Sequence, residues 1–232
     1  MPFVTSLRCT YPSSTPSIPS IPSIPSPPSP PALARRWLAA ARRWLLVAAL
    51  AAAGPQAAAL ENPIAGVPFE PQVQLAGQTL QLNGTGLRAV AWFKGYAAAL
   101  YLAQSAGSAE AALAQAGAKR LQLRLLTDVP VAEFIKAFHK GVERNTPAAS
   151  HSALSERMAR FDGLLQPLAT VHKGDLVNLD WLPGQGMVFW HNGRQLGAAI
   201  PGDDFYAALL RVFLGEHPVD AALKAGLLGQ RG

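Results

Sequence analysis

The stretch GDLVNLDWLPGQGMVFWHNGRQLGAAI, residues 174–200, contains three apolar runs separated by two turn signals. Pro183-Gly184 marks the first turn, and Asn192-Gly193 marks the second. Asn and Gly readily adopt the left-handed backbone conformation that a two-residue hairpin requires. The stretch therefore predicts strands joined by tight turns, and such strands pair in an antiparallel sheet.

Helical patterns flank this β region. Before it, apolar residues recur at helical spacing from about Pro130 to Arg144 and again over 152–168. After it, the segments 203–215 and 218–229 predict two more helices. We expect Asp128 to cap the first helix and Asp203 or Asp204 to cap the third. Gly215 should end the third helix, and the last helix should begin at a Pro and end at a Gly.

Further strands are expected nearer the N-terminus. Residues 70–87 read as two short strands around the turn at 76–78, and residues 88–102 continue as one long strand. A short helix over 108–118 precedes a strand with strictly alternating leucines at 121, 123 and 125. Strands and helices that are grouped in this way predict an α+β fold, in which helices cover one face of a long antiparallel sheet.

The N-terminal region divides into two segments. Residues 1–34 are rich in Pro and Ser and are expected to be disordered or polyproline-like. Residues 35–59 contain arginines, an apolar run and small residues in the order that is typical of a secretory signal peptide. Two alternatives are an uncleaved membrane anchor and a twin-arginine signal. The long segment before it also suggests that the true start Met lies further downstream. We therefore expect a periplasmic domain over residues 60–232 that meets the membrane only through the signal segment.

Charge and cysteine content exclude several classes of function. Five arginines and no acidic residue lie in residues 1–59, which leaves 15 basic against 14 acidic side chains from residue 60 onward. The domain therefore lacks the positive charge that nucleic-acid binding requires. Cys9 is the only cysteine and precedes the predicted domain, so thiol catalysis and a cysteine-based zinc site are excluded for the mature form.

Common catalytic and cofactor motifs are absent from the sequence. The five histidines are scattered, no His-x-x-x-His pattern occurs, and we expect no metal site. The chain contains no P-loop, no Gly-x-Ser-x-Gly and no Gly-x-Gly-x-x-Gly opening a helix, and we expect no cofactor. The glycines of NGTG (83–86) and PGQG (183–186) are interpreted as turn glycines.

Two charged residues in the apolar stretch 82–102 raise a functional question. Arg88 and Lys94 either lie on the solvated face of the sheet, or one of them meets an anionic or carbonyl oxygen in an apolar cavity. Arg suits the second role better, because its planar guanidinium matches a carboxylate or enolate. On one ideal strand Arg88 and Tyr96 share a face, whereas Tyr101 does not.

The segments GTGLR, FKGYAAALYL and GDDFYAALLRVFLGEHPVDAALKAGLLG resemble the chalcone isomerase fold, most closely its bacterial, exported, chalcone isomerase-like branch. The resemblance extends over about residues 65–229. It implies an open-faced β-sandwich with a ligand cleft between the sheet and the helices. The plant enzymes of this fold close a flavanone ring from a chalcone, and the superfamily also includes fatty-acid binders.

The resemblance also implies positions for the site residues. Arg88 matches the arginine that steadies the phenolate nucleophile in the plant enzymes. The strand position that holds a Thr in the enzymes holds Tyr96 here, and the helix position that holds a Tyr holds Phe134. The position of the Asn holds Gly141, and the position of the last Thr holds Val212. Most of the hydrogen-bond donors of the enzymes are therefore replaced, and no catalytic residue is assigned.

Three hypotheses follow. The protein is a binder of a small apolar acid such as a fatty acid, held in a cleft with arginine at its base. Alternatively, it is an isomerase or intramolecular lyase that acts on an enone or phenolic substrate, with Tyr96 as the acid. The third hypothesis is a structural protein with a vestigial cleft. The candidate ligand-binding residues are Arg88, Tyr96, Phe134, Phe138, Val212 and Phe213.

Overall fold

The computed structural model describes residues 64–90 and 93–230. The disordered segment predicted over 1–34 and the signal peptide predicted over 35–59 lie outside the described residues. Among the helices of the described ranges, none combines the length and the apolar character that a membrane crossing needs.

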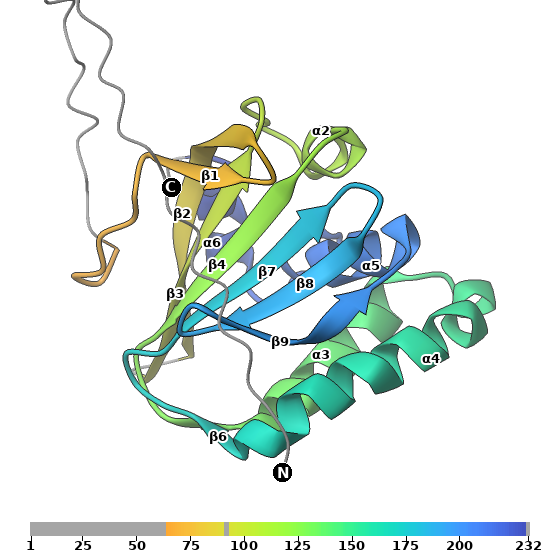
Figure 1. Cartoon of the computed structure of the whole chain (residues 1–232). Coiled ribbons are helices and arrows are strands. Elements are labelled where there is room, and N and C mark those ends of the chain that lie inside the picture. Colours follow the sequence, from red (N-terminus) through yellow and green to blue (C-terminus); the bar gives the residue numbers. More distant parts are fainter. Residues whose placement is uncertain (1–63, 91–92, 231–232) are drawn as a thin grey trace, which may run out of the picture. The chain divides into compact units, whose positions relative to one another are not determined.

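A seven-stranded sheet forms the centre of the described domain (Figure 1). Each strand pairs antiparallel with its neighbour, and the order in the sheet, β1-β2-β3-β4-β7-β8-β9, follows the order in the chain. A separate two-stranded sheet pairs β5 with β6. The strands are β1 (Gln72–Leu75), β2 (Gln78–Val90), β3 (Phe93–Leu102), β4 (Lys119–Leu125), β5 (Val129–Pro130), β6 (Thr170–Val171), β7 (Leu176–Leu182), β8 (Gly186–His191) and β9 (Arg194–Ile200).

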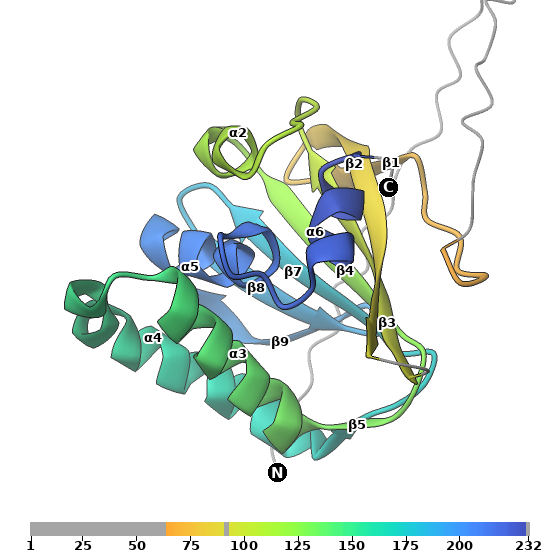
Figure 2. The ribbon, with the colours of Figure 1, turned by 180° about the vertical axis from the view of Figure 1, so that it is seen from behind.

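Helices cover one face of the seven-stranded sheet, as the view from behind shows (Figure 2). Two of them, α3 and α4, are inserted between β4 and β7, and two more follow β9. The helices are α2 (Ala109–Ala114), α3 (Val131–Asn145), α4 (Ala148–Leu165), the 3₁₀ turn η1 (Gln166–Leu168), α5 (Asp203–Leu214) and α6 (Ala221–Leu227). The predicted α+β fold, an antiparallel sheet under a layer of helices, is thus confirmed.

The meander that the opening stretch predicts is present as β7, β8 and β9. Asn192 and Gly193 connect the last two strands with φ angles of 49° and 79°, the left-handed values that a two-residue hairpin requires. The turn before it also contains left-handed glycines, since Gly184 and Gly186 have φ angles of 77° and 115°. On β4 the buried leucines at 121, 123 and 125 alternate with half-buried polar residues, as predicted.

The predicted continuous strand over 88–102 is wrong. The chain reverses there, because β2 ends at Val90 and β3 begins at Phe93, and the two strands pair antiparallel. Arg88 and Tyr96 are therefore partners across a hairpin and not residues of one strand. Tyr101 lies on the opposite face of β3, where its hydroxyl donates to the Glu70 carbonyl at 3.0 Å.

Two expected helix caps are also wrong. No side chain caps α3, since the Val131 N–H donates to the carbonyl of Ala169 beside the β5–β6 pair. Asp128 instead accepts from the backbone N–H of Lys173 at 2.8 Å. At the start of α5, neither aspartate is the cap residue: Gly202 occupies that position, and the Asp204 carboxylate pairs with Arg157.

The glycines of NGTG do not form a turn. Gly84 and Gly86 lie inside β2, where α6 approaches the strand closely. A Cβ added to Gly86 would come within 2.8 Å of the Leu223 carbonyl oxygen, and one added to Gly84 would meet the backbone of Gly226. These glycines therefore let α6 pack against the sheet backbone, which fixes the start of α6 beside the end of β2.

Candidate ligand-binding site

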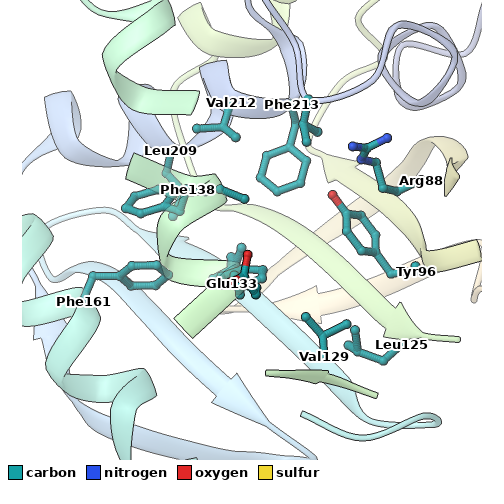
Figure 3. Close-up of a pocket in the computed structure, with 15 residues that line it drawn as sticks. Arg88, Tyr96, Leu125, Val129, Glu133, Phe138, Phe161, Leu209, Val212 and Phe213 are labelled. Atoms are coloured by element: carbon teal, nitrogen blue, oxygen red, sulfur yellow. The ribbon is translucent and has the colours of Figure 1, made fainter. Parts of the chain in front are cut away.

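A cavity of about 210 Å³ lies between the helix-covered face of the sheet and the helices α3, α4 and α5. Its lining is largely apolar, with a few polar groups, an arrangement typical of small-molecule sites. Figure 3 shows the residues around it. The lining residues are Arg88, Gly95, Tyr96, Leu125, Val129, Glu133, Phe134, Ala137, Phe138, Phe161, Leu179, Leu209, Val212, Phe213 and Val219.

A bulge in the β2–β3 hairpin lies beside Arg88. Arg88 pairs with Tyr96, whereas the next residue, Ala89, pairs with Lys94, so Gly95 is the extra residue of β3. β-Bulges increase local twist and redirect neighbouring side chains. Here the bulged glycine, the arginine and the tyrosine all line the cavity.

The Arg88 guanidinium is already bonded within the protein. Its Nη1 donates to the Asp220 carboxylate at 3.1 Å and to the Ala89 carbonyl at 3.1 Å. The Arg88 side chain is 26% exposed and that of Asp220 is 15% exposed. Arg88 therefore lines the cavity as a partly exposed, paired cation, whereas the sequence led us to expect it at the base of the cleft.

Tyr96 contributes an uncharged hydroxyl to the same end of the cavity (Figure 3). Burial raises the pKa of this phenol well above its usual range, against the opposing effect of the Arg88 charge. The hydroxyl therefore stays protonated at all physiological pH values. It can donate a hydrogen bond to a carbonyl or carboxylate oxygen.

Aromatic and aliphatic side chains close the opposite end. Phe161 is fully buried, and its ring centroid lies 4.7 Å from that of Phe138. Leu179 of β7 and Leu209 of α5 are also buried and line the cavity. This end offers only apolar surface, which suits a hydrocarbon tail.

All six candidate residues of the sequence analysis lie around this one cavity. The polar end holds two of them, α3 supplies two and α5 supplies the other two. The other candidate cation, Lys94, lies on β3 with its side chain outside the described part of the structure. The six are Arg88, Tyr96, Phe134, Phe138, Val212 and Phe213.

Sequence alone does not reveal the roles of Asp220 and Glu133. Asp220 precedes the last helix as an N-cap, and its side chain accepts from the Leu223 N–H at 3.0 Å. The sequence signal for that cap was available, but the contact with Arg88 joins residues 132 positions apart. Glu133 lies in the first turn of α3 and borders the cavity from an exposed position.

Gly141 has a packing role. A Cβ at Gly141 would lie 2.6 Å from Cγ1 of Val212, so the glycine allows α3 and α5 to approach each other. The position that holds an Asn in the plant enzymes thus accommodates a valine side chain of the neighbouring helix. It offers no hydrogen bond to a ligand.

The histidines of the domain form pairwise contacts. His139 contacts Asp162 at 2.9 Å, and His191 contacts Asp175 at 2.8 Å. Within residues 64–90 and 93–230, no group of three or more His, Cys, Asp or Glu side chains is placed to hold a metal ion. None of these four residues lines the cavity.

Comparison with known proteins agrees with the fold. The chalcone isomerase-like family matches residues 61–229, and the chain belongs to this family. Among solved structures, it is similar to a fatty-acid binding protein of Arabidopsis thaliana, with a TM-score of 0.56 and 16% sequence identity over 70% of this chain and 92% of the plant chain. This likeness is one of fold. No curated protein sequence matches the chain.

Proposed function

We propose that the protein binds a small amphiphile, such as a fatty acid, with its tail in the apolar cavity and its head group beside Arg88 and Tyr96. The observation that carries the proposal is the polarity of the cavity. Hydrogen-bond donors occupy one end, and the buried side chains of Phe138, Phe161 and Leu179 close the other. The similar plant structure is named a fatty-acid binding protein, which supports this choice of ligand class.

The size of the cavity limits the length of the tail. A dry cavity of about 150 Å³ binds benzene, which has six carbon atoms. In proportion, the 210 Å³ of this cavity corresponds to about eight carbon atoms. A chain of about eight to ten carbons therefore fits, and a longer chain extends past Glu133 and Ala137 into solvent.

We place this binding in the periplasm. The arginines, the apolar run and the small residues of 35–59 support export, and the domain that follows has no cysteine to be oxidised there. N-terminal sequencing of protein recovered from a periplasmic extract tests this location. Cleavage near residue 59 supports export, and intact protein found only in the cytoplasm contradicts it.

Binding is tested by calorimetry with saturated fatty acids of 6 to 16 carbons. Each buried methylene contributes about 0.8 kcal/mol, so affinity should rise about fourfold per carbon up to about ten carbons and then level off. A fatty acid that saturates the protein at a concentration below millimolar supports the proposal. No binding at any chain length contradicts it.

A matched pair of substitutions on α3 links binding to this cavity. Ala137 and Ala132 are both exposed on the helix, but only Ala137 lines the cavity. Ala137→Trp should obstruct the cavity and weaken binding at least tenfold, whereas Ala132→Trp should leave binding unchanged. Equal effects of both substitutions would place the ligand elsewhere.

An isomerase or lyase remains a second candidate, because the protonated Tyr96 hydroxyl lies near a guanidinium. This pair can stabilise an enolate oxygen that develops on an enone substrate. Phe134 and Val212 donate no hydrogen bonds in the same cavity, which favours binding over catalysis. Turnover of chalcone or other enones that is lost in Tyr96→Phe would establish the second candidate.

A further inference from the structure

Asp220 changes the electrostatics of the head-group end. Its Oδ1 accepts from the Leu223 N–H at 3.0 Å, which caps α6, and its Oδ2 accepts from Arg88 Nη1 at 3.1 Å. The carboxylate is thus held by the helix and directed at the guanidinium. Because the two side chains carry opposite charges at 3.1 Å, the polar end of the cavity has no net positive charge from this pair.

The other charged group that lines the cavity adds negative charge. Glu133, on α3, is the carboxylate among the lining residues, whereas Asp220 acts on the cavity through its contact with Arg88. A ligand carboxylate bound to Arg88 would lie near Asp220 and would leave water for an apolar cavity. Its desolvation would be poorly compensated, because the nearby cation is already paired.

An uncharged carbonyl avoids this repulsion. Its oxygen accepts hydrogen bonds but carries no full charge, so its transfer into the cavity costs less. The protonated Tyr96 hydroxyl is one available donor. Within the described part of the chain, both hydrogen bonds of the Arg88 guanidinium use Nη1, so its Nε and Nη2 groups can donate to a ligand. The donors of the site therefore suit a ketone, an ester or a protonated carboxylic acid.

We infer that Asp220 determines head-group selectivity in this cavity: by pairing with Arg88 it makes the site favour an uncharged carbonyl over a carboxylate. This inference rests on the proposed function, namely that an amphiphile occupies the cavity. A fatty acid would then bind in its protonated form. Asp220 is a selectivity-determining residue that acts through Arg88.

The test compares two ligands of ten carbons, decanoate and 2-decanone, by calorimetry at pH 8, where decanoic acid is ionised. The wild-type protein should bind 2-decanone at least as tightly as decanoate. In Asp220→Asn the side chain still caps the helix, because Asn is as good a cap as Asp, but the charge is removed. Decanoate should then bind about tenfold more tightly, and 2-decanone should change less than twofold.

Two further variants keep the test decisive. Asp162→Asn removes the same charge at a residue that contacts His139 outside the cavity, and it should leave the ratio of the two affinities unchanged. Asp220→Ser retains a capping hydroxyl without charge and replaces Asp220→Asn should that variant fail to fold.

The possible results separate the two proposals. Tighter binding of decanoate than of 2-decanone in the wild type, or an unchanged ratio in Asp220→Asn, would overturn the role of Asp220 while leaving the ligand-binding function intact. Failure of the wild type to bind either ligand would instead overturn the proposed function itself.

Discussion

Tyr96 supplies a hydrogen-bond donor whose charge state does not vary. Burial raises the pKa of its phenol, and the residue pairs across the hairpin with Arg88. Arg88 in turn forms an ion pair with Asp220. At this scale the site consists of one neutral donor, one paired cation and one capping carboxylate, and its selectivity depends on their balance.

Removal of the Tyr96 hydroxyl should weaken binding without unfolding the protein. Tyr96→Phe keeps the ring and loses one hydrogen bond to the ligand, which is worth about 0.5 to 1.5 kcal/mol. We expect the dissociation constant of 2-decanone to rise about 2- to 12-fold, measured by calorimetry, with little change in the thermal unfolding midpoint. An unchanged dissociation constant would show that the hydroxyl does not contact the head group.

At the scale of elements, the site depends on how closely α6 packs on β2. Gly86 and Gly84 allow that approach, and α6 carries Asp220 at its start. The cap, the ion pair and the polar end of the cavity are therefore linked to glycines inside a strand. From the sequence these glycines read as turn residues, since nothing local indicates that a helix more than 130 residues away lies against them.

A methyl group at Gly86 should separate the two elements. In Gly86→Ala the Cβ would lie 2.8 Å from Leu223 atoms, and overpacking of this kind costs about 1 to 3 kcal/mol of unfolding free energy. Because Asp220 moves with α6, its pairing with Arg88 should weaken, and the affinity for decanoate should rise relative to that for 2-decanone. Urea unfolding and calorimetry measure the two effects.

Gly163→Ala is the matched control for that substitution. Gly163 lies in α4, and a Cβ added there would meet no atom within 4 Å other than those of the adjoining helix backbone, so the change should stabilise the protein by about 0.5 to 1 kcal/mol through helix propensity. Equal stability of Gly86→Ala and the wild type would contradict the close packing of α6.

The stability of the β8–β9 hairpin should depend on pH through the carboxylate of Asp175. The carboxylate accepts from the His172 N–H, the Asn192 amide and His191, each at 2.8 Å. Burial tends to raise the pKa of Asp175, but these hydrogen bonds outweigh it and lower the pKa to about 2. A carboxyl with a lowered pKa stabilises the folded state above its unfolded pKa, and this contribution is lost as the pH falls through the folded value.

Asp175→Asn should therefore be less stable than the wild type near pH 7 by about 1 to 2 kcal/mol. The difference in unfolding free energy should shrink as the pH falls from about 4 to about 2. Denaturant unfolding at pH 7, 4, 3 and 2 measures it. A difference that stays constant over this range would contradict the assigned hydrogen bonds.

At the scale of the whole molecule, local patterns predicted the sheet and the helices, and the tertiary contacts could not be predicted. Alternating leucines and the Asn192-Gly193 turn carried the strand predictions. The segment AVAWFK, residues 89–94, contains no Gly, Pro, Asn or Asp, so the reversal between β2 and β3 gave no turn signal. Arg88 and Tyr96 came first from the pattern of the stretch 82–102, and Phe134 and Val212 came from the family resemblance. Phe161, Leu179 and Asp220 enter the site only through packing.

The most direct test of the account is the position of a labelled tail in the cavity. In a crystal structure of the protein with 8-bromooctanoic acid, the anomalous signal of bromine marks the end of the tail. We predict one bromine peak among Phe138, Phe161 and Leu179, with the carboxyl group beside Arg88 and Tyr96. A bromine beside Arg88, or a cavity without ligand under saturating conditions, would contradict the account.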